Sequence, residues 1–190
     1  MAPLFRRGVT QLELMVAMAL GLIVMLAATL LYVFVLRKLF WIEEATDRQL
    51  LAMQALASVR TDLRESSVEA VFAGPADVLA LGVQAMPARG GERRWLAFPV
   101  VYANRAGTLM RLQNFSSPIT SVSPPAWDPG RLEAALRGEG GWQRRAFRGC
   151  ALGRVELHGD VVRFSVKFLQ RRWDGTREEQ TLSGEVGYRL

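Results

Sequence analysis

Cysteine, histidine and lysine are scarce in this chain of 190 residues, which has one Cys, one His and only two lysines, Lys38 and Lys167. A single Cys excludes an intramolecular disulfide, and one Cys with one His leaves no cluster from which a zinc site could be built. Hydrophobic residues make up 50% of the chain and charged residues 22%, which excludes both a disordered chain and a Cys-dense scaffold. We therefore expect one folded domain with no cofactor and no bound metal.

The usual signatures of an enzyme are also missing. The chain has no Gly-rich phosphate loop and no metal-ligand spacing. Cys150 and His158 are the one nucleophile and base of their kind that could pair. A lone Cys, however, is usually a small buried hydrophobe, and His158 stands in a predicted turn. We therefore expect a protein without catalytic activity, and we interpret four tryptophans as core or interface residues: Trp95, Trp127, Trp142 and Trp173.

Charged residues are absent from positions 14–36, a run of 23 residues with the sequence LMVAMALGLIVMLAATLLYVFVL. About 20 apolar residues in a helix are enough to cross a hydrocarbon core of roughly 30 Å. A secretory signal peptide has a shorter apolar stretch, about 7–15 residues, that ends at a small-residue cleavage site. Here the apolar sequence continues beyond Ala27 and Ala28, which favours a membrane span. Basic residues flank the run on both sides, so charge alone leaves its orientation open.

Glu13 stands at the very edge of this apolar run. A charge deep in a membrane helix costs about 2.5–3.5 kcal/mol on insertion scales, so an intramembrane carboxylate usually has a partner or a role. The alternative is that Glu13 lies in the headgroup region and needs neither. The spacing by itself leaves both interpretations open.

Residues 6–18, RRGVTQLELMVAM, resemble the cleavage and methylation motif of the type IV prepilin superfamily. In that family a short basic leader ending in Gly is removed by a membrane peptidase. The new first residue is then N-methylated, and a Glu stands at the fifth position of the mature chain. Cleavage after Gly8 would make Val9 the first residue and Glu13 the fifth. Val9 occupies the position at which the family prefers Phe. The resemblance covers about residues 6–40.

This resemblance implies a minor pilin or pseudopilin, in which Glu13 guides the entry of the subunit into a growing filament. It implies a single-pass protein of the inner membrane, with a cytoplasmic leader and a periplasmic C-terminal domain that reaches the cell surface or outer membrane on assembly. The implied partners are other pilins or pseudopilins, the prepilin peptidase, the inner-membrane assembly platform and membrane lipids. The implied fold is a long N-terminal helix packed on a sheet.

The residues offer a physical reason for the role of Glu13. Cleavage after Gly8 would expose an α-amino group four residues before the carboxylate, and residues i and i+4 are neighbours on a helix. Pairing with the amine of the same chain or of an adjacent chain would offset a charge that apolar surroundings penalise.

The helical pattern continues beyond the span, because no Pro occurs between the span and Pro75. We expect one helix over residues 9–64, roughly 80 Å long at 1.5 Å per residue. Polar residues, Asp62 among them, form one face of its second half. Apolar residues recur at spacings near three, four and seven and are expected to face the domain: Leu39, Ile42, Leu50, Met53, Leu56, Ala57 and Leu63.

The remainder of the chain is predicted to form strands. Residues 95–102 and 108–113 flank a Gly-containing turn at 104–107, and Pro99 indicates an edge or a bulge in the first strand. Residues 161–169 alternate between apolar and polar, and Asp174-Gly175 is a hairpin turn leading into 176–188.

The Ser- and Pro-rich stretch 116–130 is expected to lack regular structure, and 131–137 to form a short helix. The predicted class is α+β, a transmembrane and amphipathic helix packed on an antiparallel sheet. The predicted parts are a leader (1–8), the transmembrane half of the helix (9–36), its amphipathic half (37–70) and a β-rich domain (71–190).

The globular part is basic and rich in arginine. Residues 37–190 hold 22 basic and 17 acidic residues, a net charge of +5. Such a surface suits a polyanion such as DNA, bound through salt-sensitive phosphate contacts. The alternative is a compositional preference for Arg, with partners such as Glu178 and Glu179 within the chain. The candidate DNA contacts are Arg144, Arg145, Arg148, Arg171 and Arg172.

These observations favour a structural subunit of a type IV pilus or of a DNA-uptake machine. A type II secretion pseudopilin is the alternative within the family. A plain single-pass membrane protein with a ligand-binding domain is the alternative outside it.

Overall fold

A computed structural model describes residues 10–74, 78–85, 94–116, 119–121, 123–126, 128–172 and 174–188. Its first element is α1 (Gln11–Arg64), a continuous helix of 54 residues. The chain divides into two units, Met1–Glu44 and Ala45–Leu190, so the two ends of α1 belong to different units. The predicted helix over 9–64 is confirmed from Gln11 onward, and Val9 lies outside the described residues.

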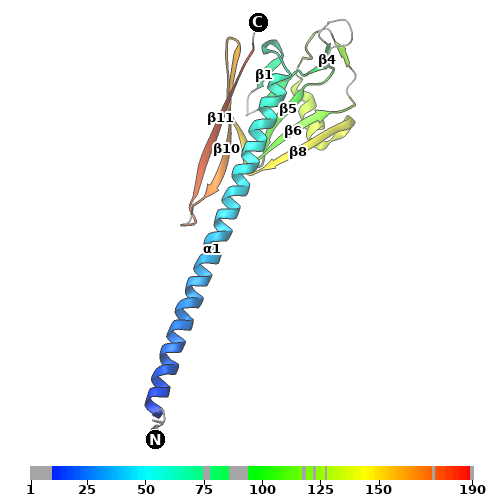
Figure 1. The fold of residues 1–190 in the computed structure, drawn as a ribbon. Coiled ribbons are helices and arrows are strands. Elements are labelled where there is room, and N and C mark those ends of the chain that lie inside the picture. The colour runs from blue at the N-terminus through cyan, green and yellow to red at the C-terminus, as the bar shows by residue number, and fades with distance from the viewer. Residues whose placement is uncertain are drawn as a thin grey trace, which may run out of the picture. The chain divides into compact units, whose positions relative to one another are not determined.

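The second unit combines the end of α1 with β-strands, short 3-10 helical turns and one short α-helix (Figure 1). The described residues form three antiparallel sheets, with strand orders β1-β2-β5-β6-β8, β11-β10-β9 and β3-β4-β7. Their strands are β1 (Val71–Gly74), β2 (Val78–Leu81), β3 (Gln84–Ala85), β4 (Arg94–Leu96), β5 (Val100–Arg105), β6 (Thr108–Asn114), β7 (Ile119–Ser121), β8 (Trp142–Arg148), β9 (Cys150–His158), β10 (Val161–Arg171) and β11 (Arg177–Gly187). The helical turns are η1 (Val68–Ala70), η2 (Pro129–Arg131), α2 (Leu132–Arg137) and η3 (Glu139–Gly141).

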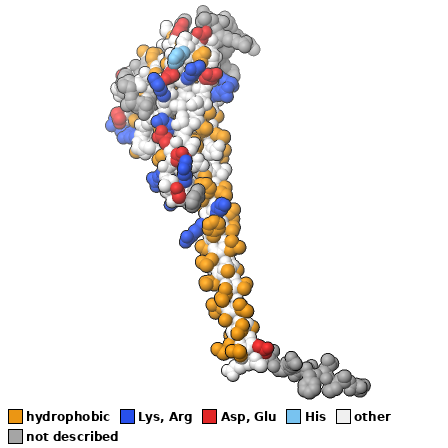
Figure 2. Space-filling model, turned by 90° about the vertical axis from the view of Figure 1, so that its left-hand side faces the viewer, with side chains coloured by type: hydrophobic (Ala, Val, Ile, Leu, Met, Phe, Trp, Pro, Cys, Tyr) orange, Lys and Arg blue, Asp and Glu red, His pale blue; other side chains and the backbone are white. Residues whose placement is uncertain are grey.

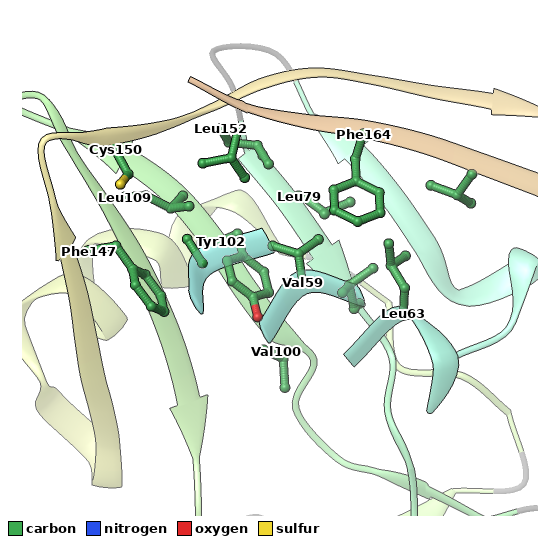
Figure 3. Packing of buried hydrophobic residues seen from close by; sticks show 14 of the residues in the cluster. Val59, Leu63, Leu79, Val100, Tyr102, Leu109, Phe147, Cys150, Leu152 and Phe164 are labelled. Atoms are coloured by element: carbon green, nitrogen blue, oxygen red, sulfur yellow. The ribbon is translucent and has the colours of Figure 1, made fainter. Parts of the chain in front are cut away.

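The main core lies between the last turns of α1 and the two larger sheets. The buried face of α1 consists of Ala52, Ala55, Val59 and Leu63. These side chains share one cluster with residues of β2, β5 and β6 on one side and of β9 and β10 on the other (Figure 3). Small Ala residues let the helix approach the sheets closely, which explains why this face is not the one with the largest hydrophobes.

A second, smaller cluster covers the opposite face of the five-stranded sheet. Ala80, Val101 and Leu112 pack there against Ala135 and Leu136 of α2. Successive residues of a strand point to opposite faces, so this sheet is buried on both sides. The predicted α+β class, a long N-terminal apolar helix packed on antiparallel sheets, is confirmed.

The strand predictions hold best where residues alternate strictly. In β10, Val162, Phe164, Val166 and Phe168 are buried, as the alternation predicts. β11 follows the turn at Asp174 and Gly175, and the short helix predicted over 131–137 is present as α2.

Two predictions for this part of the chain were wrong, one of a strand and one of an irregular segment. Residues 95–102 do not form one strand. β4 ends at Leu96, before Pro99, and β5 begins at Val100 in a different sheet. The stretch 116–130, expected to lack regular structure, contains the three-residue strand β7 and most of η2. β7 forms within this stretch because it pairs with β4.

The expected inward face of α1 was also wrong in part. Leu50 is 53% exposed and Met53 is 49% exposed, whereas Asp62, expected on the polar face, is only 5% exposed. The helix therefore has two apolar sides, and the side with the smaller residues packs on the domain. The buried charge of Asp62 is met by partners on β5 and β6, described below.

Candidate functional site

The surface of α1 in the first unit is apolar and exposed. Its most apolar window of 18 residues has a mean hydropathy of 2.6, with no residue of the window buried. Figure 2 shows hydrophobic side chains along this part of the helix. The hydroxyl group of Thr29 in this run donates to the Met25 carbonyl oxygen at 2.8 Å, which satisfies it without water. By length and composition the helix can cross a membrane, although a signal sequence near the N-terminus meets the same test.

Glu13 and Thr10 form a reciprocal cap at the start of α1. Glu13 Oε2 accepts hydrogen bonds from the Thr10 backbone N–H at 2.8 Å and from Thr10 Oγ1 at 3.0 Å. The Glu13 backbone N–H in turn donates to Thr10 Oγ1 at 3.3 Å. This is the capping box, in which Thr and Glu satisfy amide groups that the first helical turn leaves without partners.

The capping box was missed in the sequence, although its Thr-x-x-Glu spacing is visible there. It gives Glu13 a local structural role that is independent of any filament. Gly8 and Val9, the residues of the expected cleavage site, lie outside the described residues, so processing stays a prediction.

The second half of α1 carries apolar residues on the side opposite its buried face. Leu50, Met53 and Ala57 are exposed, and we call them the outer stripe. Their spacing of three and four residues places them on one side of the helix. The same apolar pair occurs eleven residues earlier in the sequence as Leu39 and Ile42, which are exposed in the first unit. Exposed apolar residues of α1 therefore occur in both units of the chain.

Asp62, on the buried side of α1, forms hydrogen bonds with two residues of the five-stranded sheet. Its Oδ2 accepts from Arg111 Nε at 2.7 Å and from the Tyr102 hydroxyl at 2.5 Å, and its Oδ1 accepts from Arg111 Nη2 at 2.8 Å. Burial and the negative charge of Asp62 both raise the pKa of Tyr102, which keeps that hydroxyl protonated as a donor. The hydrogen bond to Asp62 raises the pKa of Arg111 as well. The three side chains form a satisfied polar cluster beside the apolar core.

The arginines of β8 lie on both faces of the sheet. Arg145 is opposite Arg111 in the ladder with β6, and its guanidinium lies 5.2 Å from the centre of the Phe147 ring. Arg144, the neighbouring residue of the strand, points to the opposite face of the sheet. It donates there to the Leu136 carbonyl oxygen at 2.9 Å, on the side covered by α2. Arg148 points to the same face as Arg144, and all three side chains are exposed. Residues adjacent in sequence are therefore divided between two faces.

The remaining candidate arginines lie at the end of β10, in another sheet. Arg172 forms a salt bridge with Glu178 at 2.7 Å, as the alternative interpretation of an intramolecular partner expected. Arg171 lies opposite Arg177 in the register with β11. On the face of the domain seen in Figure 2, blue basic and red acidic side chains are interspersed. The candidate DNA contacts thus fall into two groups, of which only the β8 group lacks a carboxylate partner within the described residues.

Cys150 and His158 stand at opposite ends of β9. At about 3.3 Å per residue the two positions are roughly 26 Å apart, so the strand does not bring them together as a nucleophile and base. Cys150 is buried, and burial raises the pKa of its thiol.

No family model, no curated protein and no solved structure matches this chain. The architecture itself, a long apolar N-terminal helix packed on antiparallel sheets, is pilin-like.

Proposed function

We propose that this protein is a minor pilin or pseudopilin, a non-enzymatic subunit anchored in the inner membrane that enters a filament through α1. The observation that carries the proposal is the outer stripe. A simple membrane anchor needs apolar surface only where it meets lipid, yet Leu50 and Met53 are exposed on a part of α1 that already packs on the domain. Such a surface is typical of a protein interface.

The start of α1 supports the same proposal. The Glu13 carboxylate is positioned at the first turn of an apolar helix, where it would meet the amine released by cleavage after Gly8. In a bundle of parallel helices this pairing removes an uncompensated charge from apolar surroundings. Val9 would be the residue that is N-methylated.

The test separates the charge of Glu13 from its role in the cap. Glu13→Gln keeps a side chain that suits a capping box but removes the charge, whereas Thr10→Ala removes the cap and keeps the charge. We expect Glu13→Gln to be inserted and processed but to be poorly recovered in sheared filaments. Thr10→Ala is expected to be incorporated much more efficiently. Normal incorporation of Glu13→Gln would contradict the assembly role of the charge.

Processing is tested directly by the mass of the N-terminus. In a host that has a prepilin peptidase, the purified chain is expected to begin at Val9 with one added methyl group. A chain that still begins at Met1 in that host would contradict the pilin proposal and favour a single-pass membrane protein with a ligand-binding domain.

The machine that uses this subunit is proposed to be a type IV pilus or a DNA-uptake apparatus. The exposed arginines of β8, which lack carboxylate partners within the described part of the chain, favour it over a secretion pseudopilus. A deletion strain is expected to lose transformation or twitching motility. Loss of protein secretion alone would assign the chain to a type II secretion system.

A further inference from the structure

Two of the three sheets end in a long strand with one unpaired edge. Within the described residues, β8 pairs only with β6, and β11 pairs only with β10. Figure 1 places β8 and β11 on opposite sides of the domain. An unpaired edge presents backbone N–H and C=O groups that readily pair with another strand.

The register of β11 shows which of its residues face outward. The Tyr188 N–H donates to the Asp160 oxygen at 2.8 Å, and the Arg172 N–H donates to the Thr176 oxygen at 2.7 Å. Hydrogen-bonded and non-hydrogen-bonded pairs alternate in an antiparallel ladder, and this register is unbroken over β10 and β11. The even-numbered residues of β11 therefore bond to β10. The odd-numbered ones direct their backbone groups outward: Arg177, Glu179, Thr181, Ser183, Glu185 and Gly187.

The same argument applies to β8. A two-residue turn, Ala106-Gly107, with φ angles of 47° and 70°, joins β5 to β6. Turns of this kind close on a hydrogen-bonded pair, here Arg105 with Thr108, so the even-numbered residues of β6 bond to β5. Its odd-numbered residues then bond to their partners in β8, which are also odd-numbered. The outward backbone groups of β8 are those of Trp142, Arg144, Ala146 and Arg148.

Neither edge, 142–148 or 177–187, is protected by a proline, a lysine or a bulge, and the charged residues on these edges are Arg and Glu. Their charges are opposite. β8 has three arginines and no acidic residue, whereas β11 has three glutamates and a single arginine.

We propose that β8 of one copy of this chain pairs antiparallel with β11 of a second copy. The outward groups match when Arg148 lies opposite Glu179 and Ala146 opposite Thr181. Arg144 then lies opposite Ser183 and diagonal to Glu185, on the same face, within reach of a long side chain.

The ion pairs that the two glutamates make within the chain do not prevent this contact. Glu179 lies 2.9 Å from Lys167 Nζ, and Glu185 lies 3.6 Å from Arg163 Nε. All four side chains are largely exposed, and pairs of this kind contribute little to stability. The glutamates can therefore share a second cation from the neighbouring copy.

The contact joins two different surfaces, so an assembly of any length keeps one free β8 at one end and one free β11 at the other. A head-to-tail contact of this type produces open chains and not closed dimers. It uses neither the N-terminal motif nor the outer stripe, so it is independent of the proposed filament role of α1. It does engage Arg144 and Arg148, which are also candidate DNA contacts.

The experiment measures self-association of the full chain in detergent micelles by sedimentation at increasing protein concentration. The wild type is expected to form a concentration-dependent series beyond the dimer. Ala146→Pro removes an outward N–H and spares the ladder with β6, so it is expected to abolish the series while the thermal unfolding is retained. The matched control Ala146→Val keeps the N–H and is expected to associate as the wild type does.

A charge exchange tests the register. Arg148→Glu and Glu179→Arg are each expected to raise the dissociation constant about fivefold, because like charges would face each other. The double variant is expected to restore the dissociation constant of the wild type. A chain that stays monomeric at every concentration would overturn the proposal. Unchanged association of Ala146→Pro would also overturn it, because the contact would then be made by α1. A double variant that associates no more strongly than the single variants would overturn it as well.

Discussion

Arg111 on β6 holds both carboxylate oxygens of Asp62 on α1, with Nε and Nη2 at 2.7 and 2.8 Å from Oδ2 and Oδ1. The planar guanidinium matches a carboxylate in this two-point geometry. A third N–H group of Arg111, on Nη1, donates to Gln113 at 2.6 Å, which keeps the side chain extended along the sheet. The pair sets the rotation of α1 on the sheet, and with it the side of the helix that is left for other contacts.

Asp62→Asn is expected to destabilise the domain by about 3 kcal/mol, because it leaves the Arg111 charge half-buried without a counter-charge. The free energy of unfolding is measured by denaturant titration of the full chain in micelles. Glu69→Gln, which changes an exposed acid nearby, is the control and is expected to have no effect. Equal losses in both variants would show that the ion pair contributes nothing specific.

Leu50→Ser with Met53→Ser is expected to leave unfolding unchanged and to reduce recovery in filaments severely. Both side chains are about half exposed in the single subunit, so their loss costs little until an assembly buries them. Val59→Ser on the buried side should show the opposite pattern, with lower stability in the isolated chain. If the double variant is stable and assembles normally, the outer stripe is not an interface.

The candidate DNA contacts predict unequal effects. Replacing Arg144, Arg145 and Arg148 with Gln should abolish binding of duplex DNA by the full chain, measured by fluorescence anisotropy. Arg172→Gln should change it little, because Arg172 is already paired with Glu178. Three phosphate contacts predict a loss of affinity of about 40-fold between 50 and 200 mM salt. Binding that is insensitive to salt, or to the β8 variants, would contradict a role of this strand.

Cys150 is expected to resist alkylation in the folded chain. The thiolate is the reactive form, and burial both shields the sulfur and raises the pKa of the thiol, so less thiolate is present near neutral pH. Intact mass after brief iodoacetamide treatment should show no adduct in the folded protein and one adduct after denaturation. Rapid labelling under native conditions would show that this end of β9 opens.

Gly184→Ala is expected to destabilise the domain by about 1–3 kcal/mol through overpacking. A Cβ at Gly184 would lie 2.7 Å from Phe164 Cζ, and this ring is buried in the core. Gly187→Ala is a matched control on the same strand, because an added Cβ there meets nothing within 4 Å. Thermal unfolding of the two variants should differ clearly, and equal midpoints would show that the Phe164 ring can move aside.

Elements with a strict period could be predicted from the sequence. The alternation over 161–169 predicted β10 and its buried face, because a strand with one face in the core allows only one register. The absence of Pro between the apolar run and Pro75 predicted one continuous helix, and α1 ends at Arg64, close to the expected end.

What could not be predicted depends on contacts between distant residues. The burial of Asp62 requires Arg111, 49 residues away in the sequence, and nothing near Asp62 indicates that partner. The buried side of α1 was misassigned because Leu50 and Met53 are more hydrophobic than Ala52 and Ala55, whereas close packing selected the smaller residues. The split before Pro99 was missed because a run of apolar residues does not reveal that its two halves belong to different sheets.

The last turns of α1 are part of the interior of the domain, and this limits how the protein can be shortened. Arg48 donates to the Leu169 carbonyl oxygen at 2.8 Å, and Tyr188, near the other end of the chain, donates its hydroxyl to the Leu63 carbonyl oxygen at 2.8 Å. Removing the apolar segment for solubility should therefore stop before Ala45. A cut placed at the end of the helix would extract Val59 and Leu63 from the core and expose the strands that they cover.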